Sequence, residues 1–252
     1  MFIFVIMLII PFTVSAEEIE SEVVAESTKY IKTTTIYNNS NVMRNAGYTD
    51  ISSITTEITK EEFDSANTTT NEVAPAAVVD DVQTETTYKR LRTTIETYGG
   101  YYRYETNLYW KNIPKVRSYD IIGIGHYADV ELLSTTAIFF NQDYCLSAGN
   151  CYTSSSGTDV IGTNGTAVVF NVPDDTLISL EQTIGFTVKK ATSGTVYGHT
   201  AAGDYAHATK SISSSTAANN VVVNIMGLSL SGTISSYYDT TPAAIAEWDC
   251  VW

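Results

Sequence analysis

The chain is poor in basic residues. Of its 252 residues, 14 are Lys or Arg and 28 are Asp or Glu, which gives a formal net charge of −14 and a pI near 4.5. A nucleic-acid-binding protein needs a cationic face for the phosphate backbone, so this balance argues against nucleic acid as a partner. Apolar residues make up 44% of the sequence and charged residues 17%, which excludes a fully disordered chain.

Histidine and cysteine, the residue types most used in metal and nucleophile chemistry, number only three each. The zinc-peptidase helix motif H-E-x-x-H, the nucleophile elbow G-x-S-x-G and the zinc-ligand spacing C-x-x-C are all missing. No familiar catalytic motif therefore assigns an activity. We expect no cofactor.

The cysteines allow one short disulfide. Cys145 and Cys151 enclose a turn-prone segment and could pair if the chain is exported, which would leave Cys250 over. A loop this short contributes about 2 kcal/mol of stability. The alternative is that all three thiols stay reduced and half-buried.

The sequence has a single long apolar run. Residues 2–14 (FIFVIMLIIPFTV) lead to the small-x-small tripeptide Val14-Ser15-Ala16 and then to acidic residues, the pattern of a secretory signal peptide over 1–16. No Lys or Arg precedes the run. A membrane anchor is the alternative, but spanning a bilayer takes about 20 apolar residues. We predict cleavage after Ala16, a secreted protein and no stable membrane span after cleavage.

Residues 17–83 are rich in Thr, Asn and Glu and contain few large apolar side chains. This composition predicts a mostly disordered low-complexity spacer or pro-segment. One local signal stands out, because Thr59 and Glu62 have the spacing of a capping box. We therefore expect a short helix over 59–66, anchored by Phe63.

From Thr84 onward the pattern changes to a period of two. Tyr102, Tyr104, Thr106, Leu108 and Trp110 alternate with polar or exposed positions, and an earlier alternating run covers 91–97. Gly99-Gly100 separates the two runs, and glycine permits the positive φ of a tight turn. These residues predict a β-hairpin.

Short apolar segments divided by Gly, Ser and Asn follow to the end of the chain. They predict an all-β domain over 84–252, an antiparallel β-sandwich of roughly ten short strands, with a closed barrel as the alternative. The strand candidates are 118–127, 130–140, 165–172, 183–190, 195–200, 204–211, 220–226 and 228–237.

A turn at 201–203 would make the segments 195–200 and 204–211 antiparallel neighbours. His199 and His207 would then lie close together, and with Asp204 they form a candidate site for zinc or iron, to which His126 could add a ligand. The competing interpretation places His126 in the core or at its rim.

Other acidic residues offer weaker candidates. Asp120, Asp129, Glu131 and Asp143 lie among the central predicted strands and provide carboxylate pairs of the kind that glycosidases use. The Asp174-Asp175 pair suits either a turn or a calcium loop. In a chain with 28 acidic residues, most carboxylates are expected to be solvated surface groups.

Tyrosine is the most abundant aromatic residue, with 17 copies. Clusters such as Tyr101-Tyr102 and Tyr237-Tyr238 offer flat rings with polar edges, which suit sugar stacking or adhesive protein contacts. Tyrosine is also a favoured strand residue, so a purely structural role explains the same pattern.

Three segments resemble uncharacterised secreted proteins of Gram-positive bacteria: Thr86–Leu91, Tyr109–Gly123 and Tyr205–Ala208. The resemblance spans roughly 84–240 and implies a β domain behind an export signal and a variable N-terminal segment. That group has no established activity, so no catalytic residue is carried over. Within its most specific stretch we expect Pro114 to end a strand and Arg117 to pair with Asp120.

Together these features predict a secreted, acidic β-sandwich that acts as a non-catalytic surface or binding module for an extracellular or cell-surface ligand. The alternative function is a secreted hydrolase or metal-dependent enzyme that uses His199, His207 and Asp204.

Overall fold

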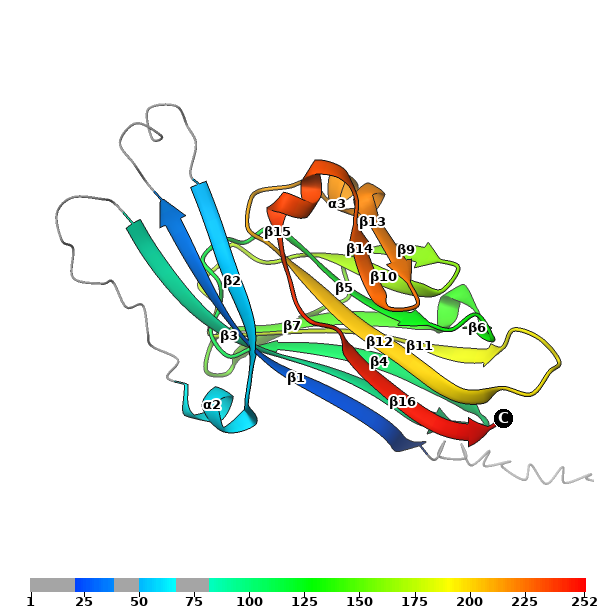
Figure 1. Cartoon of the computed structure of the whole chain (residues 1–252). Coiled ribbons are helices and arrows are strands. Elements are labelled where there is room, and N and C mark those ends of the chain that lie inside the picture. The colour runs from blue at the N-terminus through cyan, green and yellow to red at the C-terminus, as the bar shows by residue number, and fades with distance from the viewer. Residues whose placement is uncertain (1–20, 39–49, 67–81) are drawn as a thin grey trace, which may run out of the picture.

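Antiparallel strands in two packed sheets make up most of the protein in the computed structural model of the chain, which describes residues 21–38, 50–66 and 82–252 (Figure 1). The predicted all-β sandwich is confirmed. Sixteen strands lie in the described part of the chain, more than the roughly ten expected. Two of them lie upstream of Thr84, the predicted strand 130–140 is divided in two, and the strands at 150–154, 158–162, 238–240 and 244–251 were not predicted. The predicted signal peptide over 1–16 lies outside the described residues.

The larger sheet has eight strands in the order β2-β1-β3-β4-β11-β7-β8, with β6 paired to one end of β11. Every pairing in it is antiparallel. Its strands are β1 (Ser21–Asn38), β2 (Asp50–Ile58), β3 (Val82–Tyr98), β4 (Tyr101–Trp110), β6 (Val130–Leu132), β7 (Ile138–Ser147), β8 (Asn150–Ser154) and β11 (Ser179–Lys190).

The smaller sheet has six strands in the order β15-β12-β5-β10-β9, and β16 pairs with the other half of β12. Its strands are β5 (Tyr119–His126), β9 (Thr158–Gly162), β10 (Gly165–Asn171), β12 (Tyr197–Ala208), β15 (Tyr238–Thr240) and β16 (Ala244–Val251). The remaining elements are the hairpin β13 (Val221–Asn224) and β14 (Gly227–Leu230), the helices α2 (Lys60–Ser65) and α3 (Ser214–Asn220), and the 3₁₀ turns η1 (Thr135–Ala137) and η2 (Gly232–Tyr237).

The predicted hairpin at the double glycine is confirmed as β3 and β4. Gly99 and Gly100 have φ values of 55° and 82°, which a two-residue turn between twisted strands requires. Tyr98 pairs with Tyr101 at the turn, and the inward row of β4 is buried from Tyr104 to Trp110.

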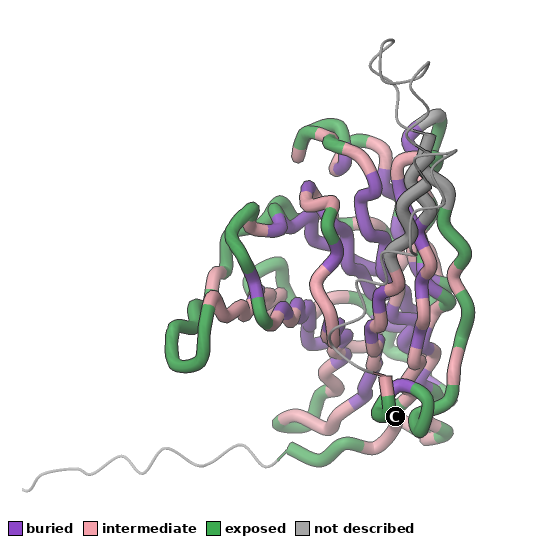
Figure 2. The backbone as a smooth tube through the Cα atoms, turned by 90° about the vertical axis from the view of Figure 1, so that its left-hand side faces the viewer, coloured by how far each residue is buried: buried purple, intermediate pink, exposed green. Residues whose placement is uncertain are grey.

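The main core fills the space between the two sheets, where Figure 2 shows most of the buried residues. Its largest members are Trp110, Tyr104, Tyr205, Phe170 and Phe186. A second apolar cluster lies on the outer face of the smaller sheet, where α3, η2 and the β13–β14 hairpin cover Ile121, Val169 and Ala206. The smaller sheet is therefore covered on both faces around β5 and β10.

The prediction that residues 17–83 are mostly disordered is wrong for the part of them that the structure describes. β1 lies between β2 and β3 in the larger sheet and pairs with β3 from Ser21 to Asn38. Its inward row, Ile31, Thr33 and Thr35, is buried. Threonine is a good strand former, and its hydroxyl can find hydrogen-bond partners when it is buried. A Thr-rich strand can therefore be buried without the alternation of apolar and polar residues by which strands are recognised in a sequence. Residues 17–20, 39–49 and 67–81 lie outside the described residues.

The short helix within this region is confirmed. α2 begins after Thr59, whose hydroxyl accepts a hydrogen bond from the Glu62 amide, and Phe63 is its buried residue. In the part of the chain that the structure describes, no helix is both long and apolar enough to cross a membrane.

The predicted turn at 201–203 is also wrong. β12 runs without a break through Ala201, Ala202 and Gly203. The small residues serve a close approach of the two sheets. A Cβ added to Gly203 would lie 1.9 Å from Thr93 Oγ1 on β3 and 2.3 Å from Thr106 Oγ1 on β4. Glycine at this position therefore reflects packing between the sheets.

Candidate functional site

The residues predicted to share a metal are not brought together. His199 and His207 lie eight positions apart on one strand, which separates them by roughly 26 Å at about 3.3 Å per residue. Asp204 lies five residues after His199 and three before His207. Because side chains alternate between the two faces of a strand, it points to the face opposite to both histidines. Among residues 21–38, 50–66 and 82–252, no group of three His, Cys, Asp or Glu side chains has the geometry to hold a metal ion.

Asp204 instead fastens the outer hairpin to the smaller sheet. Its carboxylate accepts hydrogen bonds from the Leu228 amide at 3.1 Å and from the Tyr205 amide at 2.7 Å. Burial raises the pKa of this carboxyl to about 6, although the two amide donors partly counteract the shift. A structural role accounts for all of these contacts.

His199 lies in an aromatic cluster at one end of the core. Its Nδ1 is 2.6 Å from the Tyr104 hydroxyl, and its ring lies 3.9 Å from the Tyr102 ring and 5.1 Å from the Trp252 ring. Burial lowers the pKa of His199 to about 4. The imidazole is therefore neutral at neutral pH and shares a hydrogen bond with the Tyr104 hydroxyl.

The lowered pKa makes His199 a source of acid sensitivity. Its folded-state pKa of about 4 lies below the ordinary value of about 6.5, so between these values the unfolded chain binds the extra proton and stability falls as the pH falls. His199→Asn keeps an acceptor near Tyr104 and removes the titration. Between about pH 7 and pH 4, the free energy of unfolding should fall less in the variant than in wild type. The difference between the two falls should be up to about 3 kcal/mol. Denaturant unfolding at both pH values measures this, and equal pH slopes would contradict it.

His126 occupies the core, in line with its predicted apolar face. The side chain is fully buried, and its Nδ1–H donates to the Tyr127 carbonyl oxygen over 2.8 Å. Burial lowers the pKa of this imidazole as well. The backbone amide of His126 donates to the Asn164 carbonyl oxygen, which fixes the end of β5.

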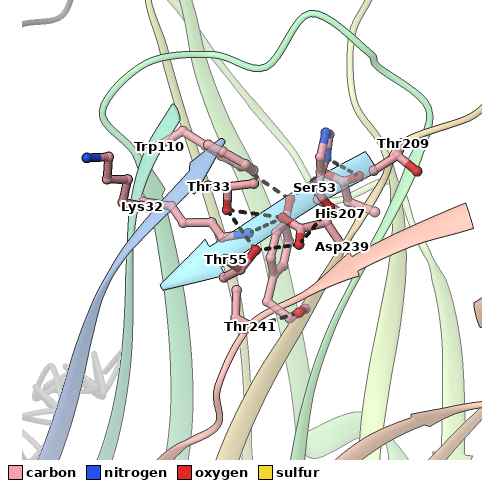
Figure 3. A network of polar contacts seen from close by, with 12 residues as sticks. Lys32, Thr33, Ser53, Thr55, Trp110, His207, Thr209, Asp239 and Thr241 are labelled. Carbon is pink, nitrogen blue, oxygen red and sulfur yellow. Dashed lines mark hydrogen bonds and ion pairs between the residues drawn. The ribbon is translucent and has the colours of Figure 1, made fainter. Parts of the chain in front are cut away.

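A buried polar network crosses the other end of the sandwich (Figure 3). Asp239 on β15 lies at its centre and accepts hydrogen bonds from Thr33 at 3.1 Å and from Thr55 at 2.5 Å. Its Oδ2 is also 3.4 Å from Lys89 Nζ. Burial opposes ionisation of Asp239, but the Lys89 charge and the Thr55 hydroxyl outweigh it, so the pKa of Asp239 lies below its ordinary value.

Lys89 projects from β3 into the core, and its side chain is 1% exposed. The ammonium lies over the Trp110 ring at 5.0 Å and the Tyr205 ring at 5.4 Å. Burial lowers the pKa of Lys89, and the nearby Asp239 restores only part of the shift. The neighbouring Lys32 points its ammonium away from the network (Figure 3).

Asp120 on β5 forms the second half of the network. Its carboxylate accepts hydrogen bonds from the Tyr205 hydroxyl and from the Ala208 amide, and its Oδ1 is 3.0 Å from His207 Nδ1. The prediction that Arg117 pairs with Asp120 is wrong. The Arg117 guanidinium instead donates to backbone carbonyl oxygens, including those of Pro114 and Pro173.

A small crevice of about 10 Å³ opens beside this network. His207 lines it together with Thr33, Thr87 and Thr209. A volume of this size holds about one water molecule. This crevice therefore has room for about one water molecule beside the network.

The second candidate site is a hollow of about 240 Å³ at the outer face of the larger sheet. Its lining includes Tyr109, Asp143, Glu181 and the disulfide between Cys145 and Cys151. The disulfide pairs neighbouring residues on β7 and β8, as their spacing allowed, while Cys250 is free. Tyr144 and Tyr152 complete the wall and stack on each other at 5.4 Å.

The polar residues of this hollow form one row across neighbouring strands. Tyr109 on β4 pairs with Glu181 on β11, Glu181 with Asp143 on β7, and Asp143 with Thr153 on β8. At the β3 end, Arg90 pairs with Tyr109 and lies 5.4 Å from its ring. Asn107 donates to Glu181 over 2.7 Å. The row therefore offers an aromatic ring beside two adjacent carboxylates.

Sequence reasoning missed Lys89, Asp239 and Glu181. A usable signal existed for Lys89, because it occupies an inward position of the alternating row that continues through Leu91, Thr93 and Ile95. A charged residue in such a row indicates a buried ionisable group.

No model of a known protein family and no curated protein matches the chain. Among solved structures, it is similar to the collagen-binding domain of the Erysipelothrix rhusiopathiae surface protein RspB, with 9% identity, a TM-score of 0.28 and 66% of each chain covered. It is also similar to AvmM, which catalyses macrocyclization in alchivemycin A biosynthesis, with 7% identity, a TM-score of 0.21, 41% of this chain covered and 64% of AvmM. The chain thus spans just under two thirds of either structure.

Proposed function

We propose that the chain is a secreted, non-catalytic binding module that holds an extended, cationic stretch of an extracellular polypeptide against the outer face of its larger sheet. The observation that carries the proposal is the hollow in which Tyr109, Glu181 and Asp143 form one cross-strand row. The resemblance to secreted Gram-positive proteins supports a bacterial surface or extracellular setting.

The hollow suits binding because its residues project from a rigid scaffold. Tyr109, Glu181 and Asp143 come from three hydrogen-bonded strands, and the Cys145–Cys151 disulfide ties the adjacent edge. Side chains held by strands lose little freedom on binding, which favours affinity. Binding sites built this way need no loop closure.

The chemistry of the row favours a cationic partner. Each carboxylate has about four lone-pair positions. Glu181 uses one for Asn107, and Asp143 accepts from Asn141 and Thr153, so both keep acceptors for Lys or Arg side chains. The Tyr109 ring offers a face to proline rings or aliphatic stems. A net charge of −14 steers such a partner toward the protein.

Two features support export. Residues 2–14 are apolar and end at Val14-Ser15-Ala16, the form of a cleavable signal peptide. The Cys145–Cys151 disulfide is of a kind that persists in oxidising compartments. Expression of the full chain in a secreting host should therefore release a protein that begins at Glu17, as N-terminal sequencing would show. Retention in the cell with Met1 intact would contradict export.

The released protein is the sample for the binding test. Collagen, the ligand named for the RspB domain, is a suitable first probe because its extended chains carry proline rings and basic residues. The variant D143N/E181Q removes both charges at almost constant shape. We expect it to bind collagen roughly 10-fold more weakly, as loss of one or two charge-assisted hydrogen bonds predicts.

The matched control removes two exposed carboxylates from β16, which belongs to the other sheet, as E247Q/D249N. This control changes the net charge equally, so a general electrostatic effect would weaken both variants alike. Equal loss in both would contradict the hollow as the binding site. Immobilised polysaccharide serves as the comparison ligand. Its preferential binding would refute the polypeptide ligand, and its cleavage would refute the non-catalytic role.

A further inference from the structure

Lys89 has the most unusual environment of the described residues. Its side chain is 1% exposed, and the one carboxylate within ion-pair distance is that of Asp239, at 3.4 Å. Aromatic rings of Trp110 and Tyr205 lie over the amine, and no shorter hydrogen bond to it is formed within the described part of the chain. Burying an ion pair in this way costs more solvation than a single long contact returns.

We propose that Lys89 and Asp239 become joined by an intramolecular amide bond, formed between Lys89 Nζ and Asp239 Cγ with release of one water molecule. The bond would be a self-made modification of this chain and would not depend on any ligand. It would replace the weak buried ion pair with a neutral link.

The contact geometry supplies both reactants. Lys89 Nζ and Asp239 Oδ2 are 3.4 Å apart, which holds the amine next to the carboxyl group with which it would react. Burial lowers the pKa of Lys89 and so favours its neutral amine. The Lys89 charge is the main influence that lowers the pKa of Asp239, so a proton that moves from Lys89 to Asp239 removes that influence and leaves a neutral amine beside a neutral acid. The amine is then a nucleophile and the acid carries a potential leaving hydroxyl.

Atoms and charges balance without an added reagent. Starting from the ammonium and the carboxylate, the Nζ–Cγ bond forms and one Cγ–O bond breaks. Nitrogen passes two of its three protons to the departing oxygen, which leaves as water. No oxidant, reductant or activated group is needed.

Asp120 and His207 are placed to assist the proton transfers. His207 pairs directly with Asp239 in the β12–β15 register, and its Nδ1 is 3.0 Å from Asp120 Oδ1. The negative charge of Asp120 also acts on Lys89. We assign Asp120 as a positioning residue that holds His207 and stabilises positive charge on the attacking amine.

The surroundings favour the amide over its hydrolysis. The Trp110 and Tyr205 rings keep the reacting groups in a dry environment. The crevice of about 10 Å³ beside His207 has room for the water that leaves. The same crevice is too small to supply bulk water.

The bond would join two distant parts of the fold. Lys89 is on β3 in the larger sheet, whereas Asp239 is on β15 in the smaller sheet, 150 residues later in the chain. An amide between them would hold the sheets together across the core and would restrict the unfolded chain.

Mass spectrometry of the purified full chain tests the proposal. The mass of wild type should be lower than the mass calculated from its sequence by one water molecule. K89M cannot form the bond, so its mass should equal the calculated value when its N-terminus is processed in the same way. Tryptic mapping should recover the peptide that contains Lys89 joined to the peptide that contains Asp239. A wild-type mass that matches the uncrosslinked sequence would overturn the proposal even if K89M does not fold.

Two further variants make the test specific. D239N changes the leaving group, so its crosslinked form should be lighter by ammonia instead of water, and D239A should form no bond. D120N should retain wild-type circular dichroism but form the bond at least 10-fold more slowly, which a purely structural residue would not cause. Equal rates of amide formation in D120N and wild type would contradict the role of Asp120 as a positioning residue. An amide between Lys89 and another residue in D239A would contradict the pairing of Lys89 with Asp239.

Discussion

A chain that begins at Thr84, the predicted start of the β domain, is expected not to fold. The structure places β1 inside the larger sheet, where it pairs with β3 along its whole length and with β2 on its other side. Removing β1 would expose the buried side chains of β3, which include Leu91 and Ile95. It would also remove the fully buried Ile31 from the core. We expect no cooperative unfolding transition by circular dichroism in increasing denaturant.

A chain that begins at Glu17 is the matched control, because it lacks only the predicted signal peptide and keeps β1, β2 and α2. It should unfold cooperatively, with a midpoint equal to that of the released protein. If the chain from Thr84 also unfolds cooperatively with a similar midpoint, β1 is dispensable and residues 17–83 behave as a spacer after all.

Local signals in the sequence predicted the local structure well. Gly99-Gly100 specified the β3–β4 turn because both residues need positive φ, and Thr59 with Glu62 specified the start of α2. The alternating row from Tyr104 to Trp110 specified which face of β4 is buried. Each of these inferences depends on residues that are neighbours in the chain.

Predictions failed where the environment is created by distant elements. Thr33 and Thr35 look like spacer residues until β2 and Asp239 supply partners for the Thr33 hydroxyl. The Ala201–Gly203 segment looks like a turn, because sequence cannot show that another sheet approaches it within contact distance. In both places a polar or small residue is buried in the core, and only the packing of the two sheets against each other shows this.

The candidate sites were hidden for the same reason. The row of Tyr109, Glu181 and Asp143 exists because β11 inserts between β4 and β7, although it follows them by many residues in the chain. Lys89 and Asp239 meet across the sandwich and are 150 residues apart. Strand order is a long-range property that alternation alone does not determine.

Replacing Gly203 should destabilise the protein strongly. A Cβ at this position would lie 1.9 Å from Thr93 Oγ1 and 2.3 Å from Thr106 Oγ1. Both threonines are fully buried and lie 3.1 Å apart in a hydrogen bond, so neither can turn away freely. We expect Gly203→Ala to lower the free energy of unfolding by about 3 kcal/mol, at the upper end of overpacking costs.

A double-mutant cycle identifies the cause of this loss. Thr93→Ala removes the hydroxyl that the new methyl group would meet, so it should destabilise Gly203→Ala less than it destabilises wild type, with a coupling of about 1 kcal/mol. Gly194→Ala is the control for a glycine exposed to solvent, where the change should stay within about 0.5 kcal/mol. Additive losses in the cycle would contradict the Thr93 hydroxyl as the cause of the destabilisation, because the added methyl group would then cost the same whether or not that hydroxyl is present.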